Sequence, residues 1–192
     1  MTEFDRGALR ADLRQRRRAL SAAERVRAGT QVGGLLEPYW NGARLAGYWA
    51  CDGELPLHAL PPTPPEAQYC LPCLLPDKRL AFAPWRPGEA LKPNRYGIPE
   101  PDLPDQSLLR PEALDVVLVP LIGFTRDGTR LGSGGGYYDR SFAFLNHMPR
   151  PQRPQLIGIA YSFQELPRLP AAPWDVALDL IVTEREVIRT AG

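Results

Sequence analysis

A glycine-rich segment carries the clearest sign of chemistry in this sequence. Four glycines, Gly132, Gly134, Gly135 and Gly136, follow an apolar run and precede a segment that starts at Tyr137. Glycine lets the backbone approach a ligand closely, and a helix start offers unpaired N–H groups and a positive dipole end. This combination predicts a phosphate site. It is neither a dinucleotide fingerprint nor a P-loop, because the required glycine spacing and the Gly-Lys-Ser/Thr ending are absent. A tight glycine turn without a ligand is the alternative.

Charged residues around the glycines could complete such a site. Arg130 and Arg140 flank the loop and could neutralise phosphate charge, although either could equally be a solvated arginine. Asp139 falls in the first turn of the expected helix, where the dipole favours a carboxylate even without a function. Beside phosphates it could hold magnesium, which takes one or two carboxylates in nucleotide sites. Asp175 and Asp179, around the start of the last apolar run, are the candidate partners.

The first thirty residues are rich in arginine, with eight arginines against four acidic residues. Arg6 and Arg10 lie one helical turn apart and could clamp a phosphate held by the glycine loop. A solvated helix face and a nucleic-acid contact are the second and third interpretations. The formal net charge of the chain is only +1, so no global field favours nucleic acid or a membrane. We therefore expect neither partner.

One carboxylate and several aromatic residues could bind an organic substrate. Glu54 follows a short apolar segment and could either anchor a polar group or cap a helix. Aromatic side chains could stack on a planar ring, although their ordinary place is the core. The aromatic candidates are Trp49, Trp85, Tyr96, Tyr137 and Tyr138.

The cysteines indicate core packing in a reducing compartment. The chain has three, and Cys70 and Cys73 form a C-x-x-C motif. A redox dithiol would need a helix N-terminus to lower its thiol pKa, and a zinc site would need two further ligands. The motif instead lies in an extended apolar run broken by prolines. We expect buried free cysteines, which pack as small hydrophobic residues.

Length and composition predict one globular domain over residues 1–192. Hydrophobic residues make up 44% of the chain and charged residues 23%, and a chain of this size should bury roughly 70% of its unfolded surface. The charge-free run 116–125 is about half of a membrane span, and no apolar signal segment precedes the charged N-terminus. We expect a cytoplasmic monomer.

Local patterns predict two helices and then short strands in the first part of the chain. Leucines at near-helical spacing favour a helix over residues 5–20, and Ser21 with Glu24 forms a capping box for a helix ending near 36. Fourteen of the 22 prolines lie in residues 51–111, which excludes long helices there. We expect strands over 44–50, 68–74 and 79–85 and a long ordered loop over 87–111.

The second part of the chain has the pattern of an α/β sheet. The nearly continuous apolar run 115–124 predicts a strand that is covered on both faces. A helix over 137–145 and two more buried strands over 156–160 and 176–183 should follow. Strands and helices in this order predict an α/β fold with a largely parallel sheet.

Taken in order, the motifs resemble the 5-formyltetrahydrofolate cyclo-ligase family over nearly the whole chain. The glycine block joined to the upstream GIPEP element is the most specific part of this resemblance. The matching segments are the basic first helix with ALSAAER, the Glu54 region, YGIPEP at 96–101, VPLIGFTRDGTRLGSGGGYYDR at 119–140, IGIAYSFQ at 157–164 and DVALDLIVTE at 175–184.

The resemblance implies a three-layer α/β/α fold with a mostly parallel sheet. It also implies ATP-dependent conversion of 5-formyltetrahydrofolate to 5,10-methenyltetrahydrofolate, with magnesium as the ion and release of ADP and phosphate. In that reaction the formyl oxygen is phosphorylated and N10 then closes the ring. Positioning and charge neutralisation dominate a phosphoryl transfer, so no nucleophilic side chain is needed.

Site roles carried over from the family fall on residues already singled out. Arg130 and Tyr138 would be catalytic, Glu54 would bind the pterin or N10 region, Trp49 and Tyr96 would line the folate pocket, and Asp139 and Asp175 would hold magnesium. The implied ATP contacts are Arg6, Arg10, Arg130, Gly132, Ser133, Gly134, Gly135, Gly136, Tyr137 and Tyr138, and those from Ser133 to Tyr137 would also face folate.

Three positions depart from the family pattern. Arg6 stands where lysine is usual, which keeps the charge but replaces a point charge by a planar fork. Ser133 and Gly135 stand where larger or basic residues are frequent, which leaves more of the charge neutralisation to Arg130 and magnesium. The competing hypothesis is a regulatory paralogue that binds folate or RNA on the same fold. Retention of Glu54, Arg130, Tyr138 and Asp139 together favours the enzyme.

Overall fold

A seven-stranded sheet forms the centre of the computed structural model, which describes residues 5–39, 43–57, 67–149 and 153–190. The strand order is β11-β10-β9-β6-β1-β2-β3, with parallel pairing from β10 to β2 and an antiparallel strand at each edge. The sheet is therefore mostly parallel, as predicted. The strands are β1 (Arg44–Ala46), β2 (Gln68–Leu74), β3 (Leu80–Pro84), β6 (Val116–Pro120), β9 (Gln155–Ile159), β10 (Leu180–Val182) and β11 (Val187–Arg189).

Two helices precede the sheet, and both confirm the local sequence signals. The helix α1 (Arg6–Ala19) begins after Asp5, whose carboxylate accepts the N–H groups of the next turn. The helix α2 (Ala22–Leu36) begins after Ser21, and the reciprocal capping box with Glu24 is present. A capping box satisfies two N–H groups within four residues of sequence, so it needs no tertiary context to be predicted.

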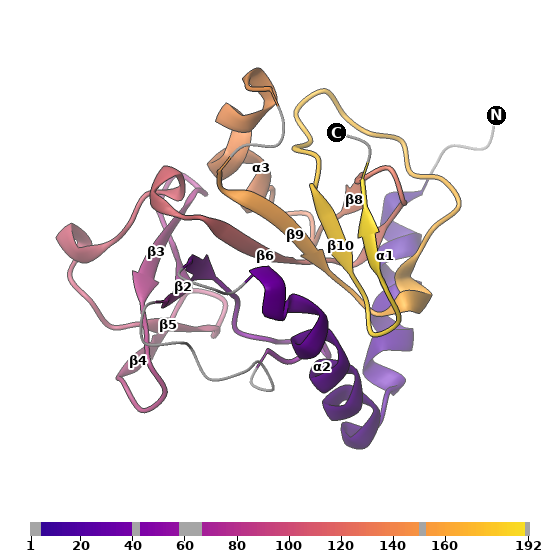
Figure 1. Cartoon of the computed structure of the whole chain (residues 1–192), viewed down its shortest axis with the longest axis horizontal. Helices are drawn as coiled ribbons and strands as arrows, with labels where there is room; N and C mark the ends of the chain where they lie inside the picture. The colour runs from indigo at the N-terminus through magenta and orange to yellow at the C-terminus, as the bar shows by residue number, and fades with distance from the viewer. Residues whose placement is uncertain (1–4, 40–42, 58–66, 150–152, 191–192) are drawn as a thin grey trace.

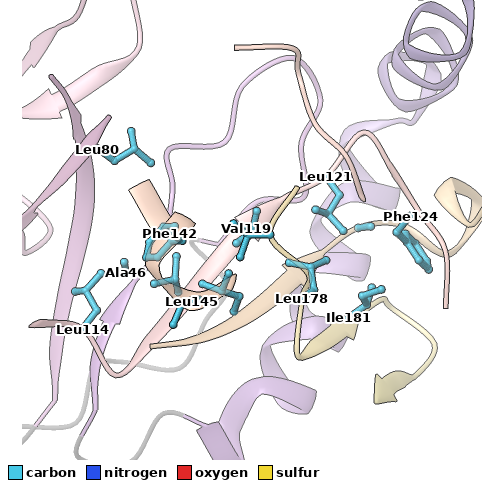
Figure 2. Close-up of a cluster of buried hydrophobic side chains, with 14 of the residues drawn as sticks. Ala46, Leu80, Leu114, Val119, Leu121, Phe124, Phe142, Leu145, Leu178 and Ile181 are labelled. Carbon is cyan, nitrogen blue, oxygen red and sulfur yellow. The ribbon is translucent and has the colours of Figure 1, made fainter. Parts of the chain in front are cut away.

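The sheet is covered on both faces, which gives the expected three layers. Alternate residues of β6 face opposite ways: Leu118 packs with Val32 of α2, and Val119 packs with Phe142 of α3. Figure 1 shows α2 and α3 on opposite sides of the central strands. Figure 2 shows Phe142 and Val119 within the core of the α3 side. The apolar run of β6 is thus explained by burial on both faces.

The third helix is shorter than predicted. We expected one helix over 137–145, whereas α3 (Tyr137–Phe142) passes into a 3₁₀ helix, η4 (Ala143–His147). Phe142 leaves α-helical geometry with φ of −112° and is completely buried. Leu145 packs with Phe142 in the same core cluster. Tertiary packing therefore overrides the local helical pattern at this point.

The predicted strand over 115–124 is split in two. The strand β6 ends at Pro120, and β7 (Gly123–Phe124) pairs with β8 (Arg130–Leu131) in a separate antiparallel ribbon. The Gln164 side chain donates hydrogen bonds to the carbonyl oxygens of Leu121 and Ile122, which the main sheet no longer pairs. A long-range partner thus redirects the chain, which an apolar pattern cannot reveal.

Other boundaries also differ from the predictions. The strands expected over 44–50 and 176–183 are confined to β1 and β10, and β11 was not predicted. The segment 87–111 is not a plain loop, because it contains the hairpin of β4 (Leu91–Pro93) and β5 (Pro99–Pro101) and two short 3₁₀ helices, η2 (Asp105–Ser107) and η3 (Pro111–Ala113). Another 3₁₀ helix, η1 (Glu37–Tyr39), extends α2, and η5 (Ser162–Gln164) follows β9. Among the described residues, none of the helices has the length and apolar character needed to cross a membrane.

The helix α1 lies across one end of the sheet. Its Leu13 packs with Ile122 and Leu131, just beyond the carboxyl end of β6. From β1 the chain continues to β2 on one side, while β6, β9 and β10 follow on the other side. In open α/β sheets such a switch point opens a crevice at the carboxyl ends of the two central strands, where ligands bind. A ligand site is therefore expected at the loops after β1 and β6.

Candidate active site

The glycine loop lies between β8 and α3 and has a backbone that favours glycine. Gly134 and Gly136 have φ of +102° and +67°, a region that side chains rarely adopt. At Gly135 a Cβ would come within 2.8 Å of the Tyr137 ring. The glycines therefore shape a tight turn whose backbone is open to the surface. Both interpretations from the sequence, a phosphate loop and a ligand-free turn, are compatible with this shape.

Two arginines of α1 reach the glycine loop. Arg10 Nε donates to the Gly132 carbonyl oxygen at 2.8 Å, and Arg14 Nη2 donates to that of Ser133 at 3.4 Å. Partial burial, followed by the positive charges of Arg6 and Arg14, lowers the pKa of Arg10. The cluster of like charges is a favourable environment for an anion. Arg10 thus lies beside the glycine loop, and its role in clamping a phosphate stays a prediction.

Arg6 contacts a different segment from Arg10. Its Nη2 donates to the Pro170 carbonyl oxygen and lies 3.6 Å from Asp175 Oδ2. That same carboxylate oxygen accepts the Ala172 N–H at 2.9 Å and closes a turn over residues 172–175. The two arginines therefore share a helix face but tie α1 to two separate loops.

Arg130, which is buried, and Asp139, which is partly exposed, form an ion pair beside the loop. Arg130 Nη2 donates to Asp139 Oδ1, and its Nη1 donates to the Val176 carbonyl oxygen. Asp139 Oδ1 also accepts the Val176 N–H at 3.2 Å. Only 6% of the Arg130 side chain is exposed, against 25% for Asp139. Arg130 therefore holds the aspartate and the segment after Asp175 in fixed positions, rather than pointing freely at the glycines.

The two predicted magnesium ligands fit a site that is completed by phosphates. Each carboxylate uses one oxygen in the contacts described above, Oδ1 of Asp139 and Oδ2 of Asp175. Magnesium in nucleotide sites takes one or two carboxylates and keeps phosphate oxygens or waters as its other ligands. Within the described residues no group of three His, Cys, Asp or Glu side chains could hold a metal ion. Asp179 accepts the Leu156 N–H at 2.7 Å and joins two strands instead.

Glu54 is a buried carboxylate in the loop after β1. Its Oε2 accepts the Cys51 N–H at 3.1 Å and the Cys51 thiol at 3.5 Å, and 10% of its side chain is exposed. Burial raises the pKa of Glu54, and the Cys51 hydrogen bonds and the positive charge of Arg17 only partly oppose this rise. The charge of Glu54 in turn contributes, after burial, to the raised pKa of Tyr138. Glu54 therefore belongs to the same electrostatic site as α3.

Arg17 is a site residue that the sequence analysis did not single out. Only 2% of its side chain is exposed. Its Nε donates to the Asp52 carbonyl oxygen at 2.8 Å, its Nη2 to Asp52 Oδ2 at 3.1 Å and its Nη1 to the Leu121 carbonyl oxygen at 3.4 Å. Nη1 also lies 3.9 Å from Glu54 Oε1. Arg17 thus joins the loops after β1 and β6, and its spacing of four residues from the buried Leu13 is the one available sequence signal.

The aromatic candidates form two groups. Trp49 meets Trp85 edge to face at 6.1 Å between ring centroids, and Tyr96 meets Tyr137 edge to face at 6.3 Å. The Tyr96 and Tyr137 hydroxyls are 3.0 Å apart. Trp49 and Tyr96 are partly or largely exposed, so both could offer a ring surface to a ligand.

Tyr138 packs against the core, and the C-x-x-C cysteines lie within it. Tyr138 stacks on Phe142 at 6.2 Å and is partly buried against the core cluster around α3. Cys70 and Cys73 are buried and free, and burial raises the pKa of both thiols to about 12. The prediction of buried core cysteines is therefore confirmed.

Comparison with known proteins identifies relatives of this chain. The model of the 5-formyltetrahydrofolate cyclo-ligase family matches residues 3–184. The 5-formyltetrahydrofolate cyclo-ligase of Escherichia coli K12 is 34% identical over 182 residues, which cover 91% of this chain and 98% of the relative. The Haemophilus influenzae protein of the same name is 33% identical over 191 residues. The alignment covers 95% of this chain and 100% of the relative.

Solved structures agree with these relatives. The 5,10-methenyltetrahydrofolate synthetase of Aquifex aeolicus superposes with a TM-score of 0.76 at 30% identity and covers 96% of this chain and 92% of its own. The synthetase of Mycoplasma pneumoniae gives a TM-score of 0.68 at 27% identity, with 94% and 99% covered. Sequence and fold therefore lead to the same group of proteins.

Proposed function

The chain belongs to the 5-formyltetrahydrofolate cyclo-ligase family, and on that premise we propose that it converts 5-formyltetrahydrofolate to 5,10-methenyltetrahydrofolate with ATP and magnesium. The observation that supports this most is the position of α1. Its Arg14 lies 3.4 Å both from the Ser133 carbonyl oxygen and from Asp52 Oδ2. The phosphate loop and the loop of Glu54 thus lie against one helix, as two substrates that react together require.

The proposed reaction has two chemical steps. The formyl oxygen attacks the γ-phosphorus of ATP, the bond from that phosphorus to the bridging oxygen breaks, and ADP leaves. The N10 nitrogen then attacks the formyl carbon of the iminium phosphate with loss of its proton, and expulsion of phosphate leaves the methenyl product. Because the first step is a phosphoryl transfer, alignment and neutralisation of charge should supply most of the catalysis.

The glycine-loop half of the site would bind the nucleotide. Arg6 and Arg10 of α1 would contact phosphates next to the backbone from Gly132 to Tyr138. Magnesium bound to Asp139 and Asp175 would add its positive charge to the phosphate oxygens. Arg130 would act by holding Asp139 and the segment around Val176, which its contacts favour.

The β1-loop half of the site would bind the folate. Glu54 would accept a hydrogen bond from the pterin or N10 region, and its raised pKa favours exchange of a proton with a ligand. Trp49 and Tyr96 would provide aromatic surface for the flat pterin and aryl rings. The loop from Ser133 to Tyr137 would face the folate as well as the phosphates.

A direct assay tests the proposal. Purified protein is incubated with 5-formyltetrahydrofolate, ATP and magnesium, and the absorbance of the methenyl product is followed over time. We expect product only when both ATP and metal are present, and controls without ATP or with EDTA should stay flat. Product without ATP would contradict the phosphoryl-transfer mechanism. Nucleotide binding without any product would favour a regulatory paralogue.

A further inference from the structure

The turn over residues 51–54 is closed by backbone groups at both of its ends. The Cys51 N–H donates to Glu54 Oε2 at 3.1 Å, and the Glu54 N–H donates to the Cys51 carbonyl oxygen at 2.9 Å. Asp52 and Gly53 between them have φ of +51° and +73°, as in tight turns with positive φ at both central positions. Arg17 Nε of α1 donates to the Asp52 carbonyl oxygen at 2.8 Å. These contacts fix the turn without the Cys51 side chain.

The Cys51 thiol is a second donor to the same carboxylate oxygen. Its Sγ lies 3.5 Å from Glu54 Oε2. A thiol is a weak donor, but an ionised acceptor makes the hydrogen bond stronger. Burial, followed by the negative charge of Glu54, raises the pKa of Cys51 to about 11. The thiol therefore keeps its proton at neutral pH and is able to donate it to the hydrogen bond.

The two oxygens of Glu54 are held differently. Oε2 accepts both donors of Cys51. Oε1 lies 3.9 Å from Arg17 Nη1, and no hydrogen bond from the described part of the chain reaches it. Rotation of the carboxylate about its last bond would exchange the two oxygens and break both contacts with Cys51. The backbone N–H and the thiol together therefore leave Oε1 as the oxygen that can accept a hydrogen bond from a ligand.

We propose that Cys51 is a positioning residue for the reaction, whose thiol holds Glu54 Oε2 and so presents Oε1 to a nitrogen group of the folate. The inference rests on the proposed function and adds a residue that acts only through Glu54. A hydrogen bond to the ionised carboxylate also favours its charged form. The thiol contact opposes the rise that burial causes in the pKa of Glu54, so loss of the thiol should raise that pKa further.

The other titratable groups around Glu54 should not obscure such a change. They are Arg17 of α1, Asp52 of the turn, Tyr48 after β1, Tyr138 of α3 and Tyr161 after β9. Burial raises the pKa of all three tyrosines, that of Tyr161 to about 12. Burial also acts to raise the pKa of Asp52, but the Arg18 hydrogen bond and the nearby arginine charges outweigh it and lower that pKa. Between roughly pH 5 and 8, Glu54 is therefore the group of this set that should change its charge.

Substitution of Cys51 provides the kinetic test, with kcat/KM for 5-formyltetrahydrofolate measured against pH. Cys51→Ala should move the acidic limb of the profile up by about half a pH unit and lower the neutral value about two- to fivefold. KM for ATP should stay within about twofold. Cys51→Ser should restore the profile, because a hydroxyl donates in place of the thiol. Superimposable profiles of wild type and Cys51→Ala, or equal shifts in both variants, would overturn the inference.

Cys73→Ala is the matched control for loss of a thiol. Cys73 is a buried free cysteine on β2, and its removal should leave the acidic limb in place even where it lowers the unfolding midpoint. A shift equal to that of Cys51→Ala would mean that thiol loss acts through general stability, and would contradict the positioning role.

Alkylation gives a second readout that needs no turnover. Modification by iodoacetamide is followed against pH, with mass spectrometry that resolves Cys51 from Cys70 and Cys73. In the wild type the Cys51 rate should still rise above pH 9, since the pKa of a free thiol is about 8.5. Glu54→Gln removes the neighbouring charge, so it should lower the pKa of Cys51 and speed its alkylation at pH 9 about three- to tenfold. Equal rates in the two proteins would reject the thiol–carboxylate contact.

The two readouts separate failure of the inference from failure of the proposed function. Alkylation that depends on Glu54, in a protein that forms no methenyl product, would support the thiol–carboxylate contact and reject the folate reaction. Product formation with the same pH profile in wild type and Cys51→Ala would support the reaction and reject the positioning role.

Discussion

The site contains two buried arginines that hold carboxylates in different ways. Arg130 bonds directly to Asp139 and leaves that carboxylate 25% exposed. Arg17 bonds to Asp52 and to two carbonyl oxygens and comes no nearer than 3.9 Å to Glu54, which is 10% exposed. The proposed nucleotide side thus has an ion-paired carboxylate that water can reach. The proposed folate side has a more buried carboxylate whose desolvation is only partly offset by its hydrogen bonds and by Arg17.

This difference suits the two proposed tasks. A metal ligand must be held in place and stay within reach of water and phosphate oxygens, and the Arg130 contact and partial exposure of Asp139 meet both needs. A carboxylate that binds a nitrogen group near a reacting centre benefits from a pKa raised by burial, because its proton can then be exchanged. Four substitutions test this contrast, and they are described in order of decreasing expected effect.

Arg17→Met should have the largest effect. It removes the donors to Asp52 and to the Leu121 carbonyl oxygen and leaves Glu54 without its nearby positive charge. Loss of one partner of a buried charged group costs about 3–5 kcal/mol, and urea denaturation would measure this as a lower midpoint. Arg16→Met is the control. That exposed arginine lies 4.8 Å over the Phe163 ring, and its loss should change the midpoint far less. Equal midpoints for the two variants would show that Arg17 does not brace the two loops.

Asp139→Asn should have the next largest effect. The amide keeps the shape but leaves Arg130 buried without its ion-pair partner, which should cost about 1–3 kcal/mol of unfolding free energy. We also expect a lower rate of methenyl formation and a requirement for more magnesium, because one anionic ligand is lost. A magnesium titration of initial rates measures this. A stability loss with unchanged magnesium dependence would assign Asp139 to bracing alone.

Glu54→Gln should affect folate use and spare nucleotide use. Loss of a charged hydrogen-bond acceptor should lower kcat/KM for 5-formyltetrahydrofolate about 10- to 100-fold, while KM for ATP stays near its original value. Initial-rate kinetics with each substrate varied in turn would distinguish the two constants. A parallel rise in KM for ATP would contradict the division of the site into two halves.

The same variant has a defined pH dependence of stability. Burial raises the pKa of Glu54, so the folded state binds this proton more tightly than the unfolded state. The stabilising effect of that proton is fully present below the unfolded pKa and is lost as pH rises through the folded pKa. Glutamine has no such proton. Unfolding measurements across this window should therefore show the wild type losing stability relative to Glu54→Gln as pH rises, and the opposite trend would reject the raised pKa.

Sequence alone could predict those features that are encoded over a few residues. The Asp5 and Ser21 helix starts, the buried cysteines and the glycine loop depend on local chemistry, and their positions could be read from spacing. The split of the run 115–124 could not, because it depends on Gln164, which lies some forty residues later and binds Leu121 and Ile122. Likewise, apart from its spacing of four residues from Leu13, nothing local distinguishes the buried Arg17 from its exposed neighbour Arg18. Only the packing of α1 on the loops after β1 and β6 makes that distinction.

Arg14→Gln should have the smallest effect and tests the link between the two halves. Arg14 is 31% exposed, and its contacts with Ser133 and Asp52 are both 3.4 Å long, so each contributes little. Because it contacts both loops, we expect KM for ATP and KM for 5-formyltetrahydrofolate each to rise about two- to threefold, with little change in kcat. Combination with Glu54→Gln gives a double-mutant cycle, in which residues that share a network are non-additive. Strict additivity on the folate constant would mean that Arg14 does not couple the phosphate loop to the carboxylate side, and that α1 holds the halves as independent units.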